Sequence, residues 1–149
     1  MSYINDFMQI AIEQARKAYT ENEIPVGCVI VKDGKIIFKS RNSIQKNSNP
    51  LCHAEMLCIN GALKKLNQKY LYNCDLYVTL EPCPMCMGAI TASRIARVYI
   101  GAQDNNFGAC GTMYNLCETL NHKCEVYFGI NEDECKNLLQ NFFEKMRKK

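Results

Sequence analysis

The chain has 149 residues, of which 48% are hydrophobic and 22% are charged, and its formal net charge at pH 7 is +3. A chain of this length buries roughly 68–70% of its unfolded surface, so it needs no disulfide to stabilise its core. The composition is that of a soluble globular protein, and the net charge is too small to indicate a nucleic-acid partner by itself. We therefore expect a single domain over residues 1–149.

The N-terminal segment lacks the features of a secretion signal, because charged residues interrupt its apolar positions. The longest apolar runs are too short to span a bilayer. We therefore expect a cytoplasmic protein that does not bind membranes and keeps its ten cysteines reduced. Six cysteines are expected to be small core residues: Cys28, Cys58, Cys74, Cys117, Cys124 and Cys135.

The sequence predicts five strands and four helices. In chain order these are a helix over 4–18, strands over 26–31 and 35–40, a loop over 41–52, a helix over 53–66, a strand over 75–80, a helix over 83–93, a strand over 96–100, a loop over 101–122, a strand over 124–129 and a helix from 132 onward. Asp33-Gly34 is a strong hairpin signal between the first two strands. Asn131, with Glu134 three residues later, is expected to cap the last helix.

This order of elements predicts an α/β fold in which helices cover a sheet of about five strands. The connection over 101–122 is long for a compact domain and rich in glycine and asparagine. Connections of this length are usually functional. We therefore expect this loop to contribute to a binding site.

The stretch "TLEPCPMCMGAI" (79–90) contains the chain's one Cys-x-x-Cys pair, Cys83 and Cys86. Such a pair could be a redox centre, or half of a structural zinc site that needs a second ligand pair. The sequence has no second pair, but His53 lies thirty positions before Cys83 in "CHAEM". Three protein ligands with an open fourth position, filled by water, are typical of a catalytic zinc.

The geometry of such a site requires His53 to open its helix. Side chains tilt toward the N-terminus of a helix, so both His53 and Glu55 can then reach a metal over that end. Cys83 and Cys86 share a face in the first turn of the next helix, and the positive ends of both helices favour thiolates. Two thiolates neutralise the zinc charge, so a nearby base is needed to take a proton from water. Glu55 is the candidate for this role.

His-x-Glu followed by Pro-Cys-x-x-Cys is the signature of the zinc-dependent nucleobase deaminases. The wider sequence resembles bacterial tRNA-specific adenosine deaminases in "EIPVGCVIV", "HAEM", "YVTLEPCPMCMGAI", "SRIARVYIGAQD" and "GACGT". The resemblance covers nearly the whole chain. It implies a three-layer α/β/α cytidine-deaminase-like fold with a mixed sheet, one zinc ion per chain and a homodimer. It also implies that adenosine is converted to inosine at the wobble position of a tRNA anticodon stem-loop, which we expect to be that of an arginine tRNA with anticodon ACG.

The resemblance also implies roles for residues outside the metal site. Asn42 would bond the flipped purine, the Ala54 amide would hold the oxygen added to the base, Pro25 and Val26 would shape the base pocket, and Asp104 and Phe142 would line the path of the anticodon nucleotides. Simpler interpretations remain open, since Asn42 could be a turn residue and Phe142 a core residue of a helical stripe. The family often has a basic residue where this chain has Gln103. His122 is expected to be a loop residue, and the tail "KMRKK" is either a solvated helix end or an RNA contact.

Two other functions stay open at this point. Guanine deaminases of the same superfamily also carry Glu-Pro-Cys-Pro-Met-Cys, although free-base enzymes of that branch usually have an aromatic residue where this chain has Ala92-Ser93-Arg94. A catalytically inactive subunit that only binds RNA would share the zinc ligands. Glu55 argues against that second alternative, because such subunits can lose the residue that moves the proton.

Overall fold

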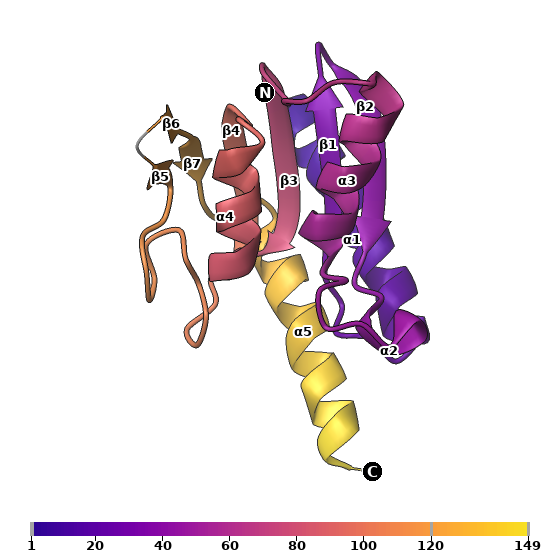
Figure 1. The fold of residues 1–149 in the computed structure, drawn as a ribbon. Helices are drawn as coiled ribbons and strands as arrows, with labels where there is room; N and C mark the ends of the chain where they lie inside the picture. Colours follow the sequence, from indigo (N-terminus) through magenta and orange to yellow (C-terminus); the bar gives the residue numbers. More distant parts are fainter. Residues whose placement is uncertain (1, 120, 149) are drawn as a thin grey trace.

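Figure 1 shows a computed structural model that describes residues 2–119 and 121–148. Lys149, the end of the basic tail, lies outside the described residues. The elements in chain order are α1 (Ser2–Thr20), β1 (Gly27–Lys32), β2 (Lys35–Arg41), α2 (Ile44–Asn47), α3 (Ala54–Leu66), β3 (Cys74–Leu80), α4 (Pro84–Ala92), β4 (Arg97–Ala102), β5 (Glu118–Thr119), β6 (His122–Lys123), β7 (Glu125–Tyr127) and α5 (Glu132–Arg147).

The central sheet has five strands in the order β2-β1-β3-β4-β7. β1 pairs antiparallel with both β2 and β3, whereas β3 pairs parallel with β4, and β4 parallel with β7. The parallel pair β3–β4 is connected through α4, as parallel strands require a crossover. The prediction of a mixed sheet of about five strands is confirmed.

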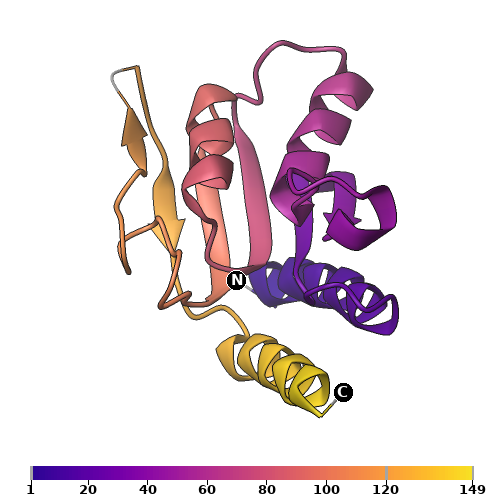
Figure 2. The same cartoon turned by 60° about the horizontal axis from the view of Figure 1, so that its bottom comes forward.

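Helices cover both faces of this sheet, with α3 and α4 on one side and α1 and α5 on the other (Figure 2). Side chains alternate along the strands, so Ile30 of β1 packs beneath α3 and α4 while its neighbour Val29 packs against α1. The three inner strands, β1, β3 and β4, are mostly buried on both faces, whereas the edge strands β2 and β7 are more exposed. The three-layer α/β/α architecture is confirmed. Within 2–119 and 121–148, no helix is long and apolar enough to cross a membrane.

The hairpin between β1 and β2 forms where the sequence predicted it. Asp33 has φ = 52° and Gly34 has φ = 75°, so both central residues of the turn have the positive φ of a type I′ turn. This turn matches the twist of the flanking strands and fixes the pairing of Lys32 with Lys35. The core role of the six cysteines is also confirmed, with five buried and Cys117 half-buried against the same cluster.

Two segments predicted as loops contain short regular elements. The first is α2, within the predicted loop 41–52. The buried carboxylate of Glu23 accepts hydrogen bonds from the backbone N–H groups of Gln45 (3.0 Å) and Lys46 (2.8 Å) and so holds this turn from outside. The second segment, 101–122, begins with the end of β4 and later forms the two-residue strand β5. Contacts distant in sequence stabilise the turn at α2, so local patterns did not reveal it.

Asn131 is the N-cap residue of α5, as predicted, but the expected capping hydrogen bonds do not form. Asn131 has φ = 53° and its side chain makes no capping hydrogen bond; its Nδ2 donates instead to the backbone oxygen of Asn5 (3.2 Å). Glu134 likewise turns to α1, where it accepts a hydrogen bond from Gln9 (2.6 Å) and pairs with Arg16. Contacts between α1 and α5 have replaced the local capping arrangement.

Candidate metal centre and active site

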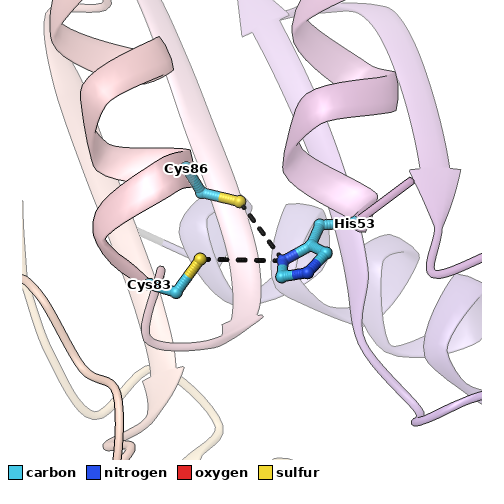
Figure 3. A group of neighbouring side chains, drawn as sticks. All are labelled: His53, Cys83 and Cys86. Carbon is cyan, nitrogen blue, oxygen red and sulfur yellow. Dashed lines mark hydrogen bonds between the residues drawn. The ribbon is translucent and has the colours of Figure 1, made fainter. Parts of the chain in front are cut away.

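Three candidate metal ligands meet where two helices begin side by side on the same face of the sheet. His53 is the N-cap residue of α3, and Cys83 is the N-cap residue of α4, with Pro84 at the first helical position. Proline is favoured there because its φ suits a helix and it has no N–H to leave unsatisfied. Cys86 lies three residues after Cys83, on the first turn of the same helix (Figure 3). The prediction that His53 opens its helix is confirmed.

The distances among these three side chains fit a tetrahedral zinc. Nδ1 of His53 lies 3.7 Å from Sγ of Cys83 and 3.6 Å from Sγ of Cys86, and all three atoms lie within 4.8 Å of one another (Figure 3). With Zn–S of ~2.3 Å and Zn–N of ~2.0 Å, tetrahedral ligation separates a nitrogen from a sulfur by ~3.5 Å. The imidazole presents Nδ1 to both sulfurs, so Nδ1 is the nitrogen that could bind the metal.

The protein groups alone already favour one thiolate at this site. A hydrogen bond from Cys86 lowers the pKa of Cys83 to about 4, and a hydrogen bond with His53 contributes a smaller lowering. Partial burial acts in the opposite direction but does not outweigh them. The same hydrogen bond and burial raise the pKa of Cys86, and the hydrogen bond to Cys83 raises the pKa of His53. Metal ligands must be deprotonated, so a bound cation would displace the remaining thiol proton.

Glu55 lies in the first turn of α3, two residues after His53, and is only 4% exposed. Burial raises its pKa from an ordinary value of 4.5 to about 7, because a charged carboxylate loses its hydration there. A carboxyl group with a pKa near neutrality can both accept and release a proton under physiological conditions. Its position beside the three ligands suits it to such transfers.

Two of the metal ligands, His53 and Cys83, border a cavity of about 450 Å³ together with Glu55. Two residues predicted to contact the substrate, Asn42 and Val26, line it, while Pro25 is buried and is not among its lining residues. Most of the wall is apolar, and the few polar groups converge near the metal centre. This combination is typical of pockets that bind a small organic group such as a nucleobase.

The Ala54 amide has a partner within the protein. It donates a hydrogen bond of 2.8 Å to Oδ1 of Asn42. Because a backbone N–H can only donate, it fixes which way the Asn42 amide points. The NH₂ group of Asn42 is therefore left to donate to a ligand in the cavity. Ala54 acts on the cavity through Asn42.

The two residues predicted to line the nucleotide path differ in exposure. Asp104 borders the cavity, and its Oδ1 accepts hydrogen bonds from the amides of Asn106 (2.9 Å) and Phe107 (3.1 Å). Phe142 is only 4% exposed and packs edge-to-face against Tyr19, but it also lines a second cavity of about 630 Å³. Its neighbour Phe143 is 43% exposed. Both rings of α5 thus reach the second cavity, and Phe143 is the more exposed of the two.

The remaining candidates lie away from the metal centre. His122 was predicted to be a loop residue, but it begins the two-residue strand β6, where its Nε2 lies 2.6 Å from the backbone oxygen of Ile95. Gln103 lines a separate cavity of about 350 Å³ together with Lys136 of α5. Lys136 thus places a positive charge in the same cavity wall as Gln103, the position where the family often has a basic residue.

Sequence reasoning missed several residues of the cavity wall, among them Ile24, Ile44 and Phe107. It also missed the buried carboxylate of Glu81, which lines the same cavity. An acidic residue at the end of an apolar strand was the one available signal, since a buried carboxylate must be paired or hydrogen-bonded.

Comparison with known proteins agrees with this geometry. Residues 1–102 match the family described as the cytidine and deoxycytidylate deaminase zinc-binding region. A tRNA-specific adenosine deaminase from Aquifex aeolicus is 43% identical over 95% of this chain and 94% of its own. A solved structure from a study of A-to-I editing by tRNA:A34 deaminases at the wobble position is 41% identical, with a TM-score of 0.84 over 90% of this chain and 99% of its own.

A guanine deaminase from Nitrosomonas europaea shares the fold, with a TM-score of 0.80 over 91% of this chain and 81% of its own, but only 22% identity. The nearly full-length match to the adenosine deaminases at about twice that identity separates the two groups. On this evidence, the chain belongs to the tRNA-specific adenosine deaminases of the cytidine and deoxycytidylate deaminase family.

Proposed function

We propose that this protein hydrolyses the C6–N6 bond of adenosine at the wobble position of a tRNA anticodon and leaves inosine. The observation that carries the proposal is the arrangement of His53, Cys83 and Cys86 around one point, with Glu55 beside them at the wall of a cavity sized for a base. We propose one zinc ion per chain, held by those three ligands.

When bound there, zinc would supply a Lewis acid that makes a water molecule acidic enough to lose a proton near neutral pH. Glu55 accepts that proton and later delivers it to the ring nitrogen or to the departing amine, so that a C–O bond replaces the C–N bond and ammonia leaves. The raised pKa of Glu55 supports both transfers. The proton stays within the site until it is delivered, because Glu55 is almost fully buried.

Asn42 orients the base. Its Oδ1 is held by the Ala54 amide, so its NH₂ group can donate to a ring nitrogen of a purine, which is an acceptor. A base that enters the cavity must leave the nucleotide stack, and this costs least in a loop that is already single-stranded. An anticodon loop meets that condition.

The substrate we propose is the anticodon stem-loop of an arginine tRNA with anticodon ACG, bound by a homodimer. The names of the relatives support a tRNA substrate. A second cavity of about 630 Å³, lined by Phe142, Phe143 and Met146 among others, lies next to the first and shares Ile24 and Ile44 with it. This neighbouring space, with an exposed aromatic ring, suits a nucleotide that flanks the reacting one.

Guanine deamination is the second candidate, because the Nitrosomonas europaea enzyme shares the fold. The two candidates differ in what the protein must grip. An enzyme acting on tRNA takes most of its binding energy from the loop around the base. A guanine deaminase encloses the free base alone.

The deciding experiment compares two substrates for the same zinc-loaded protein. One is a synthetic anticodon stem-loop with adenosine at the wobble position, and the other is guanine. We expect inosine in the stem-loop, with free adenosine and free guanine reacting poorly. An Asn42→Ala variant should slow the reaction on the stem-loop by removing the purine contact. Efficient turnover of guanine with an untouched stem-loop would reverse the assignment.

A further inference from the structure

Glu81 is a buried carboxylate at the junction between β3 and α4, two residues before Cys83, and it is only 2% exposed. Its Oε1 accepts hydrogen bonds from the amide of Asp104 (3.1 Å) and from the hydroxyl of Thr112. Its Oε2 accepts from the amides of Cys110 (2.9 Å) and Thr112 (3.3 Å). Four donors from one segment, residues 104–112, thus converge on one side chain.

These bonds leave Glu81 little capacity for chemistry. Each oxygen accepts two hydrogen bonds, which satisfies the lone pairs of an ionised carboxylate. Hydrogen bonds from backbone amides to a charged acceptor are stronger than those between neutral groups. Glu81 is therefore built to hold a segment of chain in place.

The segment that it holds forms part of the cavity wall, because Asp104 and Phe107 both line the cavity. Packing around Gly108 is close: a Cβ at this position would lie 2.5 Å from Oε1 of Glu81 and 2.5 Å from the backbone oxygen of Asp104. The next amide, Ala109, donates to the backbone oxygen of Pro82 (2.8 Å). Residues 81 and 82 thus hold segment 104–112 and lead directly into the first sulfur ligand.

We propose that Glu81 is a positioning residue that sets the distance between the metal centre and the substrate wall formed by segment 104–112. Because the wall and Cys83 share this short stretch of backbone, a nucleotide placed against Asp104 and Phe107 is also placed relative to the metal centre. The choice of substrate rests on the proposed function, but the fixing of the segment does not.

The hydrogen-bond chemistry distinguishes this role from a general effect of charge. In Glu81→Gln one oxygen becomes an NH₂ group, which cannot accept from a backbone amide. If it replaces Oε1, the Asp104 amide loses its acceptor, although the Thr112 hydroxyl can rotate and accept instead. Glu81→Asp keeps the charge but shortens the reach by one methylene. A positioning role predicts that both variants are impaired, whereas a purely electrostatic role predicts that Glu81→Asp is normal.

The first test is hydrogen exchange on zinc-loaded protein, which needs no substrate. We expect amides of 104–112 in Glu81→Gln to exchange at least about tenfold faster than in the parent, with zinc content and exchange within α4 unchanged. Asp75→Asn is the matched control, because Asp75 is a partly buried carboxylate paired with Arg97 at the opposite end of β3. Parent-like exchange of 104–112 in Glu81→Gln, or loss of zinc from it, would overturn the proposal.

The second test separates substrate positioning from chemistry. On the stem-loop we expect Glu81→Gln and Glu81→Asp to raise KM about tenfold, or about 1.4 kcal/mol, while kcat changes less than about threefold. Asp75→Asn should leave KM unchanged.

A second variant covers the case in which Glu81→Gln does not fold. Gly108→Ala displaces the same segment by pressing on an intact carboxylate, so it should also raise KM. If the parent does not deaminate the stem-loop but Glu81→Gln still shows faster exchange of 104–112, the proposed substrate is refuted and the positioning role stands. Parent-like KM in Glu81→Gln and Gly108→Ala would refute positioning.

Discussion

Two buried glutamates border the same cavity, and their surroundings give them opposite properties. Glu81 is saturated by four hydrogen bonds, and its carboxylate serves as an anchor. Glu55 has no such set of donors, and burial raises its pKa to about 7. A proton carrier must exist in both protonation states at working pH, and the raised pKa of Glu55 suits it to that task.

Replacing Glu55 by glutamine should separate chemistry from binding. Glu55→Gln keeps the size of the side chain but cannot take or give a proton. We expect near-normal zinc content and RNA affinity, with deamination slowed by at least roughly 10²–10⁴-fold. Single-turnover formation of inosine measures this. Activity within a few-fold of the parent would mean that another group moves the proton.

The ligand assignment predicts the metal content of purified protein. We expect about one zinc per chain in the parent and a marked loss in Cys83→Ala and in Cys86→Ala, measured by elemental analysis. Cys124→Ala is the control, since Cys124 is a buried cysteine that is not one of the candidate ligands. Loss of zinc should cost less folding free energy than the roughly 10–16 kcal/mol of peptides that zinc alone folds, because this chain has its own core. Full zinc in both ligand variants would refute the assignment.

At the residue scale, the sequence predicts the metal ligands well and the substrate contacts less well. The ligand pattern is local, since the spacing of Cys83 and Cys86 and the start of each helix can be read from a few neighbouring residues. The bond between Asn42 and Ala54 depends on how a loop folds back on α3, which no local pattern encodes. A helical stripe also cannot tell which of two adjacent aromatics, Phe142 or Phe143, is exposed.

At the scale of elements, α1 lies directly on the first residue of β1. A Cβ at Gly27 would lie 1.8 Å from the backbone oxygen of Ala11, a clash that only backbone movement can relieve. We expect Gly27→Ala to lower the free energy of unfolding by about 1–3 kcal/mol or more. Gly88 of α4 has nothing within 4 Å of the position that a Cβ would take, so Gly88→Ala should raise the free energy of unfolding by about 0.4–1 kcal/mol. Urea unfolding of both variants measures the contrast, and equal effects would contradict it.

The contact between α1 and α5 should depend on pH. Hydrogen bonding to Gln9 and pairing with Arg16 hold the pKa of Glu134 below its ordinary 4.5. A lowered folded-state pKa contributes stability above about pH 4.5 and loses it as pH falls through the folded value. Because the pair is partly exposed and screened by solvent, Glu134→Gln should cost only about 0.5–1 kcal/mol at pH 7 and nothing near pH 3. Thermal unfolding at both pH values tests this; a difference that persists at pH 3 would exclude ionisation as its source.

The elements that the sequence predicted correctly are those with strong local signals. Asp33-Gly34 specifies its turn through backbone conformation alone, and α1 shows a long helical period. The short helix α2 and the start of α5 depend on partners about 20 and 125 residues away, Glu23 and Asn5. Their stability comes from tertiary contacts, so periodicity and capping rules could not predict them.

At the scale of the whole molecule, the proposed substrate implies a dependence on salt. A protein that binds the phosphates of a single-stranded loop releases counterions. The logarithm of its binding constant then falls with the logarithm of the salt concentration, with a slope of about −0.7 for each phosphate neutralised. We expect stem-loop affinity to fall steeply between low and physiological salt, while binding of a neutral nucleoside should hardly change. Fluorescence titration at several salt concentrations measures both slopes. A flat stem-loop slope would exclude phosphate contacts.

The order of the central sheet also bears on how the protein behaves when concentrated. Its two outermost strands are β2 and β7, and each exposes one row of backbone groups that could pair with another molecule. β7 has only three residues, which offers a poor template. β2 is longer, but it carries Lys35, Lys39 and Arg41, and two like-charged edges repel each other. The sheet is thereby protected at both ends from growing into aggregates by strand addition.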